Sequence, residues 1–499
     1  MVNAEELANE LRARLGSHFE WLLVRSNGGT FPLRRDEIEV SVHAEKTLLS
    51  VLDDSGTGVS RVLSVSNAPE GNWISLEISR QFGGSPETIR LVPRTPAIEL
   101  SRNVEFARLE YANSVATALF EIFPAYKLTR LALNVDNGRL AQIFLRSPQG
   151  AGVAVVTDVT ATMIHESVMT SAMLWFEKLQ LRKKPITEVW IVGERKQARN
   201  LRKLIGLLTD NFAARFRIFE ISRQAGSPKL QELKRAEFRT LWREKPKKIM
   251  LPPETRATKT AEQIISLSPE KIDVIFSRQG ETIRFLGLPF ARVRTIAGRE
   301  KAWFGIERNH RQLVGDSWSE LRELVCELET YRDAGTPNKR HEFYRTSPEA
   351  WLESILRRNI KQLDSNLILS PLYNQFRASA DKIDLLAIRR DGRLVIIELK
   401  TSPDRETVFQ AADYWRKIEL QRRCGELSRV RAFGDLEILD KPALVYVAAP
   451  ALSFHRDFGY FAQALRREVE MWRFELREDW RSEIKILTRR DYPPSLTNL

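Results

Sequence analysis

The sequence has very few cysteines and no long hydrophobic run. Cys326 and Cys424 are the only two cysteines in 499 residues, and they lie far apart in the chain. This excludes a disulfide framework and a zinc site built from thiolates. No apolar run approaches the ~18 residues that are needed to span a bilayer, and the charged start MVNAEELANELRARLG predicts an amphipathic helix, not a signal peptide. We therefore expect a cytoplasmic protein with no membrane partner.

A nucleotide-binding loop is also missing. The segment SGTGVS at residues 55–60 lacks the second Gly-Lys-Ser/Thr of a P-loop and the helix that follows it. No helicase or ATP-binding motif appears elsewhere in the sequence. A helicase or ATPase that opened a duplex for this protein would therefore be a separate partner chain.

Acidic residues are fewer than basic ones. Together, 78 Lys and Arg against 65 Asp and Glu give a formal net charge of +13. Such an excess favours a polyanionic partner, nucleic acid before membrane. A basic but unspecialised surface explains the charge equally well.

The length predicts several domains in a mixed α/β, multidomain chain. Residues 1–100 contain short β-prone segments between turns after one helix, and they predict a β-rich N-terminal domain. Residues 101–225 predict an α/β domain. Residues 226–340, dense in charge and broken by prolines, predict a connecting region with a β-hairpin and a helix. Residues 341–499 predict a second α/β domain.

The clearest chemical signal lies in the last domain, in the stretch IDLLAIRRDGRLVIIELK that begins at Ile383. An Asp-Gly turn between two apolar runs predicts a hairpin, because such turns favour φ > 0. Asp384 stands at the start of the first strand. Glu398 and Lys400 stand two apart at the end of the second and so lie on one face. Burying such charges is costly, which indicates a purpose for them.

Two helices flank this hairpin. The first begins with Thr346 and Glu349 as an expected capping box, with Pro348 in its first turn, and carries Glu353 at the edge of its apolar face without a local explanation. An extended segment at 366–377 follows it. The helix after the hairpin carries Gln410 and Tyr414 four residues apart, hence on one face. With the buried strand ALVYVAA, the expected order is α-β-β-β-α-β.

This pattern resembles the PD-(D/E)XK nuclease superfamily, which has the restriction-endonuclease-like fold. Asp384, thirteen intervening residues and Glu398-Leu399-Lys400 match its central motif, with Ile383 in place of the motif's Pro. The helix with Glu353 matches the family's first motif. Gln410 and Tyr414 resemble the QxxxY element of RecB-type nucleases. The resemblance covers residues 346–455.

The resemblance implies a Mg²⁺-dependent deoxyribonuclease in which Mn²⁺ can substitute. Its implied metal ligands are Asp384, Glu398, the backbone carbonyl of Leu399, and Glu353. Hard oxygen ligands suit Mg²⁺. Lys400 would orient the attacking water or stabilise the transition state, and Gln410 and Tyr414 would contact the substrate or support the site.

The middle domain shows a similar order of elements, with Asp158 and Thr160 where the last domain has Glu398 and Lys400. We interpret it as a possible degenerate, silent copy, although α/β orders of this kind also recur by chance. Nearby, His165 and Glu166 are adjacent on a helix and are expected to diverge. We interpret them as an acidic first turn capped by Thr160 and Thr162.

Two function classes remain open. The first is a metal-dependent nuclease, acting on DNA before RNA, in repair or in defence against foreign DNA. The second is a catalytically inactive nucleic-acid-binding or assembly protein on a nuclease-like scaffold. A third explanation of Asp384, Glu398 and Lys400 is a salt-bridged cluster at a sheet edge.

Overall fold

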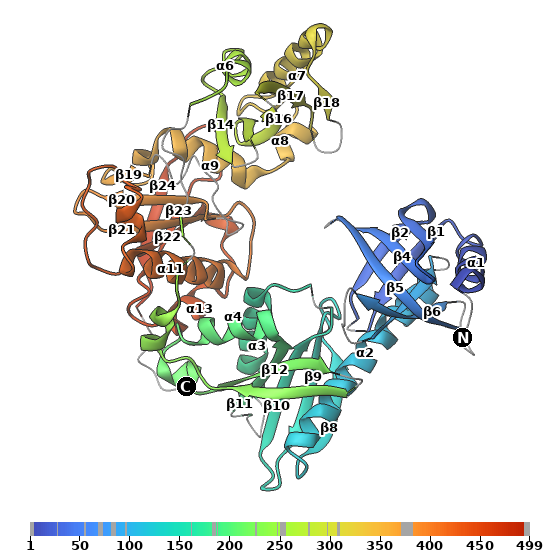
Figure 1. Ribbon diagram of the computed structural model, residues 1–499. Helices are drawn as coiled ribbons and strands as arrows, with labels where there is room; N and C mark the ends of the chain where they lie inside the picture. The colour runs from blue at the N-terminus through green and yellow to red at the C-terminus, as the bar shows by residue number, and fades with distance from the viewer. Residues whose placement is uncertain are drawn as a thin grey trace. The chain divides into compact units, whose positions relative to one another are not determined.

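The structure is a computed structural model, and it divides the chain into two compact units. The first unit is Met1–Gly206 with Asp210–Ala236, and the second is Leu207–Thr209 with Glu237–Leu499. We describe each by itself (Figure 1). The residues that the structure describes are 4–26, 28–53, 56–67, 73–80, 86–94, 97–160, 162–181, 186, 188–224, 227–246, 248–249, 256–277, 280–296, 298–306, 310–370 and 383–493.

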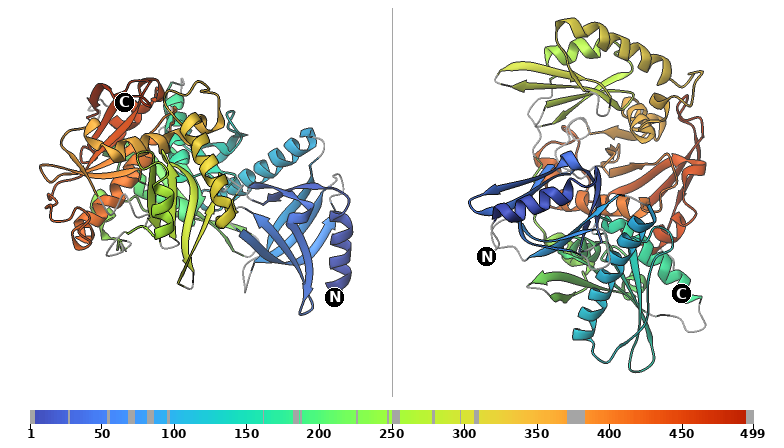
Figure 2. Two further views of the ribbon diagram at one scale, coloured as in Figure 1. Left: turned by 90° about the horizontal axis from the view of Figure 1, so that it is seen from above. Right: turned by 90° about the vertical axis from the view of Figure 1, so that its right-hand side faces the viewer.

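The first unit begins with an antiparallel seven-stranded sheet of order β2-β1-β7-β6-β5-β4-β3. One face of the sheet packs against α1, whose Leu11 and Leu15 pack with Trp21, Leu76 and Leu91. Helix α1 lies along this sheet (Figure 2). The expected β-rich N-terminal region is confirmed. Its elements are α1 (Ala4–Leu15), β1 (Glu20–Arg25), β2 (Thr30–Arg34), η1 (Arg35–Glu37), β3 (Ile38–His43), β4 (Lys46–Asp53), β5 (Gly56–Asn67), β6 (Ile74–Arg80) and β7 (Glu87–Pro93).

A mixed six-stranded sheet completes the first unit, in the order β13-β12-β11-β10-β9-β8. Helix α2 buries Tyr111, Val115 and Leu119 against one of its faces. The elements are α2 (Ala97–Ile122), β8 (Lys127–Leu133), β9 (Leu140–Arg146), β10 (Gly152–Asp158), α3 (His165–Gln180), β11 (Glu188–Glu194), α4 (Arg195–Ile205), α5 (Asp210–Ala213), β12 (Phe216–Gln224) and β13 (Ser227–Leu233).

The second unit opens with an antiparallel five-stranded sheet, β14-β15-β16-β17-β18. It has its own core, in which Phe285, Phe290 and Phe304 meet Leu321 and Leu328. This is more than the expected connecting region with one hairpin. Arg292 and Arg294 of β16, and Arg299 and Lys301 of β17, interrupt the apolar residues and so weakened the strand signal in the sequence. The elements are η2 (Phe238–Arg243), α6 (Lys259–Ile265), β14 (Ile272–Ser277), β15 (Gly280–Phe285), β16 (Leu288–Ile296), β17 (Arg299–Phe304), β18 (Arg311–Gln312), η3 (Gly315–Ser317), α7 (Trp318–Tyr331) and α8 (Glu342–Arg345).

The chain ends in a second six-stranded mixed sheet, β19-β20-β21-β22-β23-β24. Its elements begin helix, three strands, helix, strand, which is the order expected from the sequence. Part of the expected extended segment, residues 371–377, lies outside the described residues. The elements are α9 (Pro348–Arg358), η4 (Ile360–Gln362), β19 (Leu367–Leu369), β20 (Leu385–Arg389), β21 (Leu394–Leu399), α11 (Thr407–Arg423), α12 (Glu426–Arg429), β22 (Leu444–Pro450), η5 (Ala451–Ser453), α13 (Phe458–Ala464), β23 (Met471–Leu476) and β24 (Ile486–Asp491).

The two six-stranded sheets have the same topology. In both, the first three strands run antiparallel, the third to fifth run parallel, and the sixth is antiparallel to the fifth. Helices α2, α3 and α4 stand at the same points of the chain order as α9, α11 and α13. This agreement across six strands is what a duplicated fold requires.

Within the described ranges, no helix is both long enough and apolar enough to span a bilayer.

Candidate active site

The candidate site is built at one end of the hairpin β20–β21. Gly392 in the connecting turn has a φ of +85°, and Gly392 N donates to Arg389 O at 2.8 Å, so the Asp-Gly signal marks a real turn. Strand β21 is buried along its whole length, between antiparallel β20 and parallel β22. Charged groups at its far end are therefore fixed by the centre of the sheet.

Asp384 immediately precedes β20 and stands beside Glu398. The antiparallel register pairs Leu385 with Ile397, which places these two carboxylates next to each other at the strand ends. Asp384 Oδ2 accepts a hydrogen bond from the backbone N–H of Leu399 at 2.8 Å. The side chain thus replaces a ladder bond and is held in place by the backbone of β21.

Glu398 has an oxygen that lacks a hydrogen-bond partner. The side chain is buried, with 4% of its surface exposed, and its Oε1 lies 3.4 Å from Lys400 Nζ. Its Oε2 is buried and accepts no hydrogen bond. Burial, and then the Asp384 carboxylate, raise the pKa of Glu398 well above its ordinary value, against the opposing effect of Lys400. A buried oxygen of this kind is costly without a proton or a cation.

Lys400 is surrounded by acceptors. Its Nζ lies 2.8 Å from Gln410 Oε1 and 2.9 Å from Asp404 Oδ2, besides the longer contact to Glu398. Burial alone would lower the pKa of Lys400, but the carboxylates of Glu398, Asp404 and Glu349 outweigh it and raise that pKa above its ordinary value. The side chain is therefore an ammonium, suited to stabilising negative charge and unsuited to accepting a proton.

Sequence reasoning missed Asp404 altogether. The residue lies in the loop between β21 and α11, where no periodicity marks it. A local signal existed: a short polar side chain in a loop before a helix commonly accepts a hydrogen bond from the backbone N–H two residues on. Gln410, by contrast, was a candidate residue, and its Oε1 accepts a hydrogen bond from Lys400 Nζ at 2.8 Å.

Tyr414 lies one turn further along α11. Lys417 Nζ lies 5.5 Å from the centroid of its ring. A role for Tyr414 in substrate contact stays a prediction.

Glu353 does not join Asp384 and Glu398. Its Oε1 lies 3.2 Å from Arg284 Nη1 and 3.5 Å from Arg357 Nη1, deep in the protein. Among the described residues, the carboxylates of Glu353, Asp384 and Glu398 do not come within 4.8 Å of one another as a group. The expected convergence of these three carboxylates is wrong, because α9 turns Glu353 towards the neighbouring sheet.

Glu349 is the carboxylate of α9 that affects the site. It contributes to the raised pKa values of both Glu398 and Lys400. The expected capping box is also wrong: the N-cap is Ser347, at φ +47° and without a side-chain cap, whereas Pro348 does occupy the first turn. Glu349 is thus not used as a helix cap.

The corresponding place in the middle sheet lacks this chemistry. Asp158 is paired in register with Leu140, so an apolar residue stands where the last sheet has Asp384. Asp158 and Glu398 also lie on corresponding faces of their sheets. Val153 and Val155 of β10 pack into the core that contains α2, as Val395 and Ile397 of β21 pack into the core that contains α9. Asp158 and Glu398 alternate with these residues and so lie on the other face. Asp158 accepts hydrogen bonds from Thr160 N and Oγ1, from Met163 N and from Gln197 Nε2. It is a fully bonded structural carboxylate.

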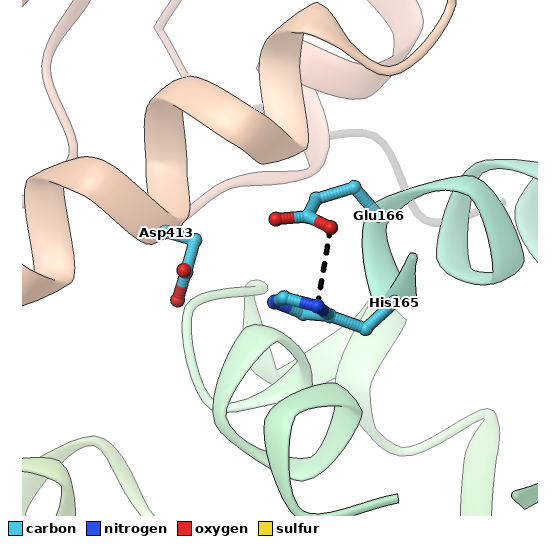
Figure 3. Close-up of side chains that lie close together, drawn as sticks. All are labelled: His165, Glu166 and Asp413. Atoms are coloured by element: carbon cyan, nitrogen blue, oxygen red, sulfur yellow. Dashed lines mark ion pairs between the residues drawn. The ribbon is translucent and has the colours of Figure 1, made fainter. Parts of the chain in front are cut away.

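His165 and Glu166 open α3, and they contact each other. Their Nδ1 and Oε2 atoms lie 3.1 Å apart as an ion pair, so the two side chains do not diverge as expected (Figure 3). Rotation about the side-chain bonds overcomes the angular offset of neighbouring helix positions. The N-cap of α3 is Ile164, without a side-chain cap, so the expected capping by Thr160 and Thr162 is also wrong.

Comparisons with known proteins give little guidance. No profile of a protein family matches the chain, and no curated protein matches it. Among solved structures, the chain matches the apo form of EndoMS at 12% sequence identity, over 44% of this chain and 98% of that one, with a TM-score of 0.17. A TM-score this low carries no argument about fold or function, so the proposal below rests on this chain's own residues.

Proposed function

We propose that the chain is a metal-dependent nuclease that hydrolyses phosphodiester bonds, in DNA, with its active site at Asp384, Glu398 and Lys400. The observation that carries this proposal is the buried Glu398 Oε2, which has no hydrogen-bond partner and lies on the same side chain as an oxygen facing Lys400. A salt-bridged cluster explains Lys400 and one oxygen of Glu398. It leaves the second oxygen of Glu398, which is buried and accepts no hydrogen bond, unexplained.

The donor set fits a hard divalent cation. Asp384 and Glu398 offer carboxylate oxygens, and the carbonyl of Leu399 lies between Glu398 and Lys400 in the chain; these are our proposed ligands. Oxygen donors of this kind suit Mg²⁺, with Mn²⁺ as a substitute. When bound, such a cation supplies Lewis acidity and makes a water nucleophilic at neutral pH. From α9 we propose Glu349, in place of Glu353, as the carboxylate whose charge acts on the cation site.

The protein's own groups have separable roles. The Lys400 ammonium stabilises negative charge that develops on the phosphate in the transition state. Gln410 holds that ammonium through its Oε1. Asp384 is fixed by Leu399 N–H, so its position does not depend on the substrate. This fixed arrangement is typical of electrostatic catalysis, in which the stabilising charges are in place before the reaction.

DNA is the proposed substrate because the chain carries a formal net charge of +13. Backbone phosphates are the polyanion that such a charge attracts. A role in repair or in defence against foreign DNA is compatible with this substrate.

Cleavage of linear, circular and single-stranded DNA and RNA, with Mg²⁺ or Mn²⁺, tests the proposal. Lys400→Ala removes the proposed charge stabiliser and Asp384→Asn removes the charge of a proposed cation ligand, so each should lower cleavage roughly 100-fold or more. Asp384→Asn keeps an oxygen for Leu399 N–H and so protects the fold. Asp391→Asn is the control: it also removes one negative charge, but it lies in the exposed turn at the opposite end of the hairpin.

Cleavage that survives both site variants would refute the assignment of the active site. Tight, salt-sensitive binding of nucleic acid without cleavage by the wild-type protein would instead favour the inactive nucleic-acid-binding or assembly protein.

A further inference from the structure

Three acceptors match the three N–H donors of the Lys400 ammonium. Asp404 Oδ2 and Gln410 Oε1 lie at 2.9 and 2.8 Å, whereas Glu398 Oε1 lies at 3.4 Å. A lysine ammonium has three donors and no acceptor. The two short contacts therefore hold the ammonium, and the contact to Glu398 is the longest of the three.

Asp404 does not depend on Lys400 for its position. Its Oδ1 accepts a hydrogen bond from Glu406 N at 2.8 Å, and its carbonyl oxygen accepts one from Thr407 Oγ1 at 3.0 Å. Both bonds tie Asp404 to the start of α11. The helix thus sets the place of the carboxylate, and Asp404 Oδ2 is a fixed anchor for the ammonium.

We propose that Asp404 is a positioning residue that holds the Lys400 ammonium away from Glu398, which keeps the Glu398 carboxylate open to a divalent cation. This inference rests on the proposed nuclease function. Opposite charges attract more strongly as their separation falls. Without the charge of Asp404, Glu398 is the nearest remaining carboxylate in contact with Lys400. The ammonium then moves onto Glu398 and competes with the cation for the same oxygens.

The test is Asp404→Asn. Asparagine keeps an oxygen for Glu406 N–H, and it forms the same side-chain turn to a backbone N–H two residues on as aspartate does. Its amide nitrogen is a donor and cannot accept from Lys400. We expect the Mg²⁺ concentration for half-maximal cleavage to rise roughly tenfold, because one charge-assisted contact is lost. The affinity for DNA and the melting temperature should stay unchanged.

Asp391→Asn is the matched control. Asp391 Oδ1 also accepts a local backbone hydrogen bond, from Arg393 N at 3.1 Å, and the change removes the same charge from an exposed turn. If Asp404→Asn fails to fold, Asp404→Ser makes the same test, because a serine hydroxyl can also accept from the backbone N–H two residues on but carries no charge.

Direct Mn²⁺ binding, followed by electron paramagnetic resonance, provides a readout that does not require cleavage. Weaker Mn²⁺ binding in Asp404→Asn than in Asp391→Asn supports the proposal. Equal Mn²⁺ binding and an equal Mg²⁺ requirement in the two variants overturn it. A wild-type protein that binds Mn²⁺ but cleaves no nucleic acid would overturn the nuclease function and leave the role of Asp404 to be decided by the binding data alone.

Discussion

At the scale of single residues, the buried Glu398 carboxylate explains most about the candidate site. One oxygen faces the Lys400 ammonium, and the other, Oε2, accepts no hydrogen bond although it is buried. Burial and the Asp384 carboxylate favour the protonated form of Glu398. A proton and a divalent cation are thus alternative ways of stabilising the same oxygen.

This competition predicts a pH dependence of stability. The pKa of Glu398 is raised in the folded protein, so between its unfolded and folded pKa values the folded state binds more protons. The free energy of unfolding of the metal-free protein should therefore fall as pH rises through that window, by up to about 1.4 kcal/mol per pH unit. Glu398→Gln should remove this slope, as urea unfolding at pH 5 to 8 would show. An unchanged slope in the variant would contradict this explanation.

At the scale of elements, helix α9 carries two carboxylates that act on different parts of the protein. Glu353 joins Arg284 of β15, whose guanidinium also makes a two-point contact with Asp273 of β14 at 2.8 and 2.9 Å. Burial alone would lower the pKa of Arg284, but these two carboxylates outweigh it and raise that pKa. Glu349, one turn earlier, influences the site at β21 instead.

The two carboxylates of α9 should respond differently to substitution. Glu353→Gln should lower the free energy of unfolding by roughly 1–3 kcal/mol, because a buried charged hydrogen bond is lost, and should leave the Mg²⁺ requirement unchanged. Glu349→Gln should change stability little and raise the Mg²⁺ requirement. Chemical unfolding and Mg²⁺ titration of cleavage measure both quantities. A raised Mg²⁺ requirement in Glu353→Gln but not in Glu349→Gln would show that Glu353 acts at the site.

The sequence was sufficient for the hairpin, because alternation and an Asp-Gly turn are local signals. It placed Gln410 and Tyr414 on one face of a helix but did not predict the contact of Gln410 with Lys400. It did not predict the partner of Glu353, because helical periodicity shows that a side chain is buried but not which element covers it. The partner, Arg284, stands 69 residues earlier in the chain. The role of Asp404 was not predicted, because loop residues have no periodic pattern.

At the scale of the whole molecule, two sheets share one topology, but only one of them carries the full set of charges. The middle sheet has Leu140 and a fully bonded Asp158 where the last sheet has Asp384 and Glu398. Thr160 stands in the place of Lys400. We therefore propose one active site in each chain, in the last sheet.

Asp158→Asn tests this assignment. Asparagine can accept at one position only, so the hydrogen bonds from Thr160, Met163 and Gln197 cannot all survive. We expect the free energy of unfolding to fall by about 1–3 kcal/mol. Cleavage per folded molecule should stay unchanged, measured on supercoiled plasmid after correction for the folded fraction by circular dichroism. A loss of cleavage as large as that of Lys400→Ala would show that the middle sheet takes part in the chemistry.

Direct Mn²⁺ binding measures the proposed cation site at Asp384 and Glu398 without requiring cleavage. Electron paramagnetic resonance should detect Mn²⁺ bound by the wild-type protein and by Asp391→Asn with equal affinity. Binding at this site should be lost in Glu398→Gln and in Asp384→Asn, while circular dichroism shows both variants to be folded. Mn²⁺ bound with unchanged affinity by these two variants would contradict the claim.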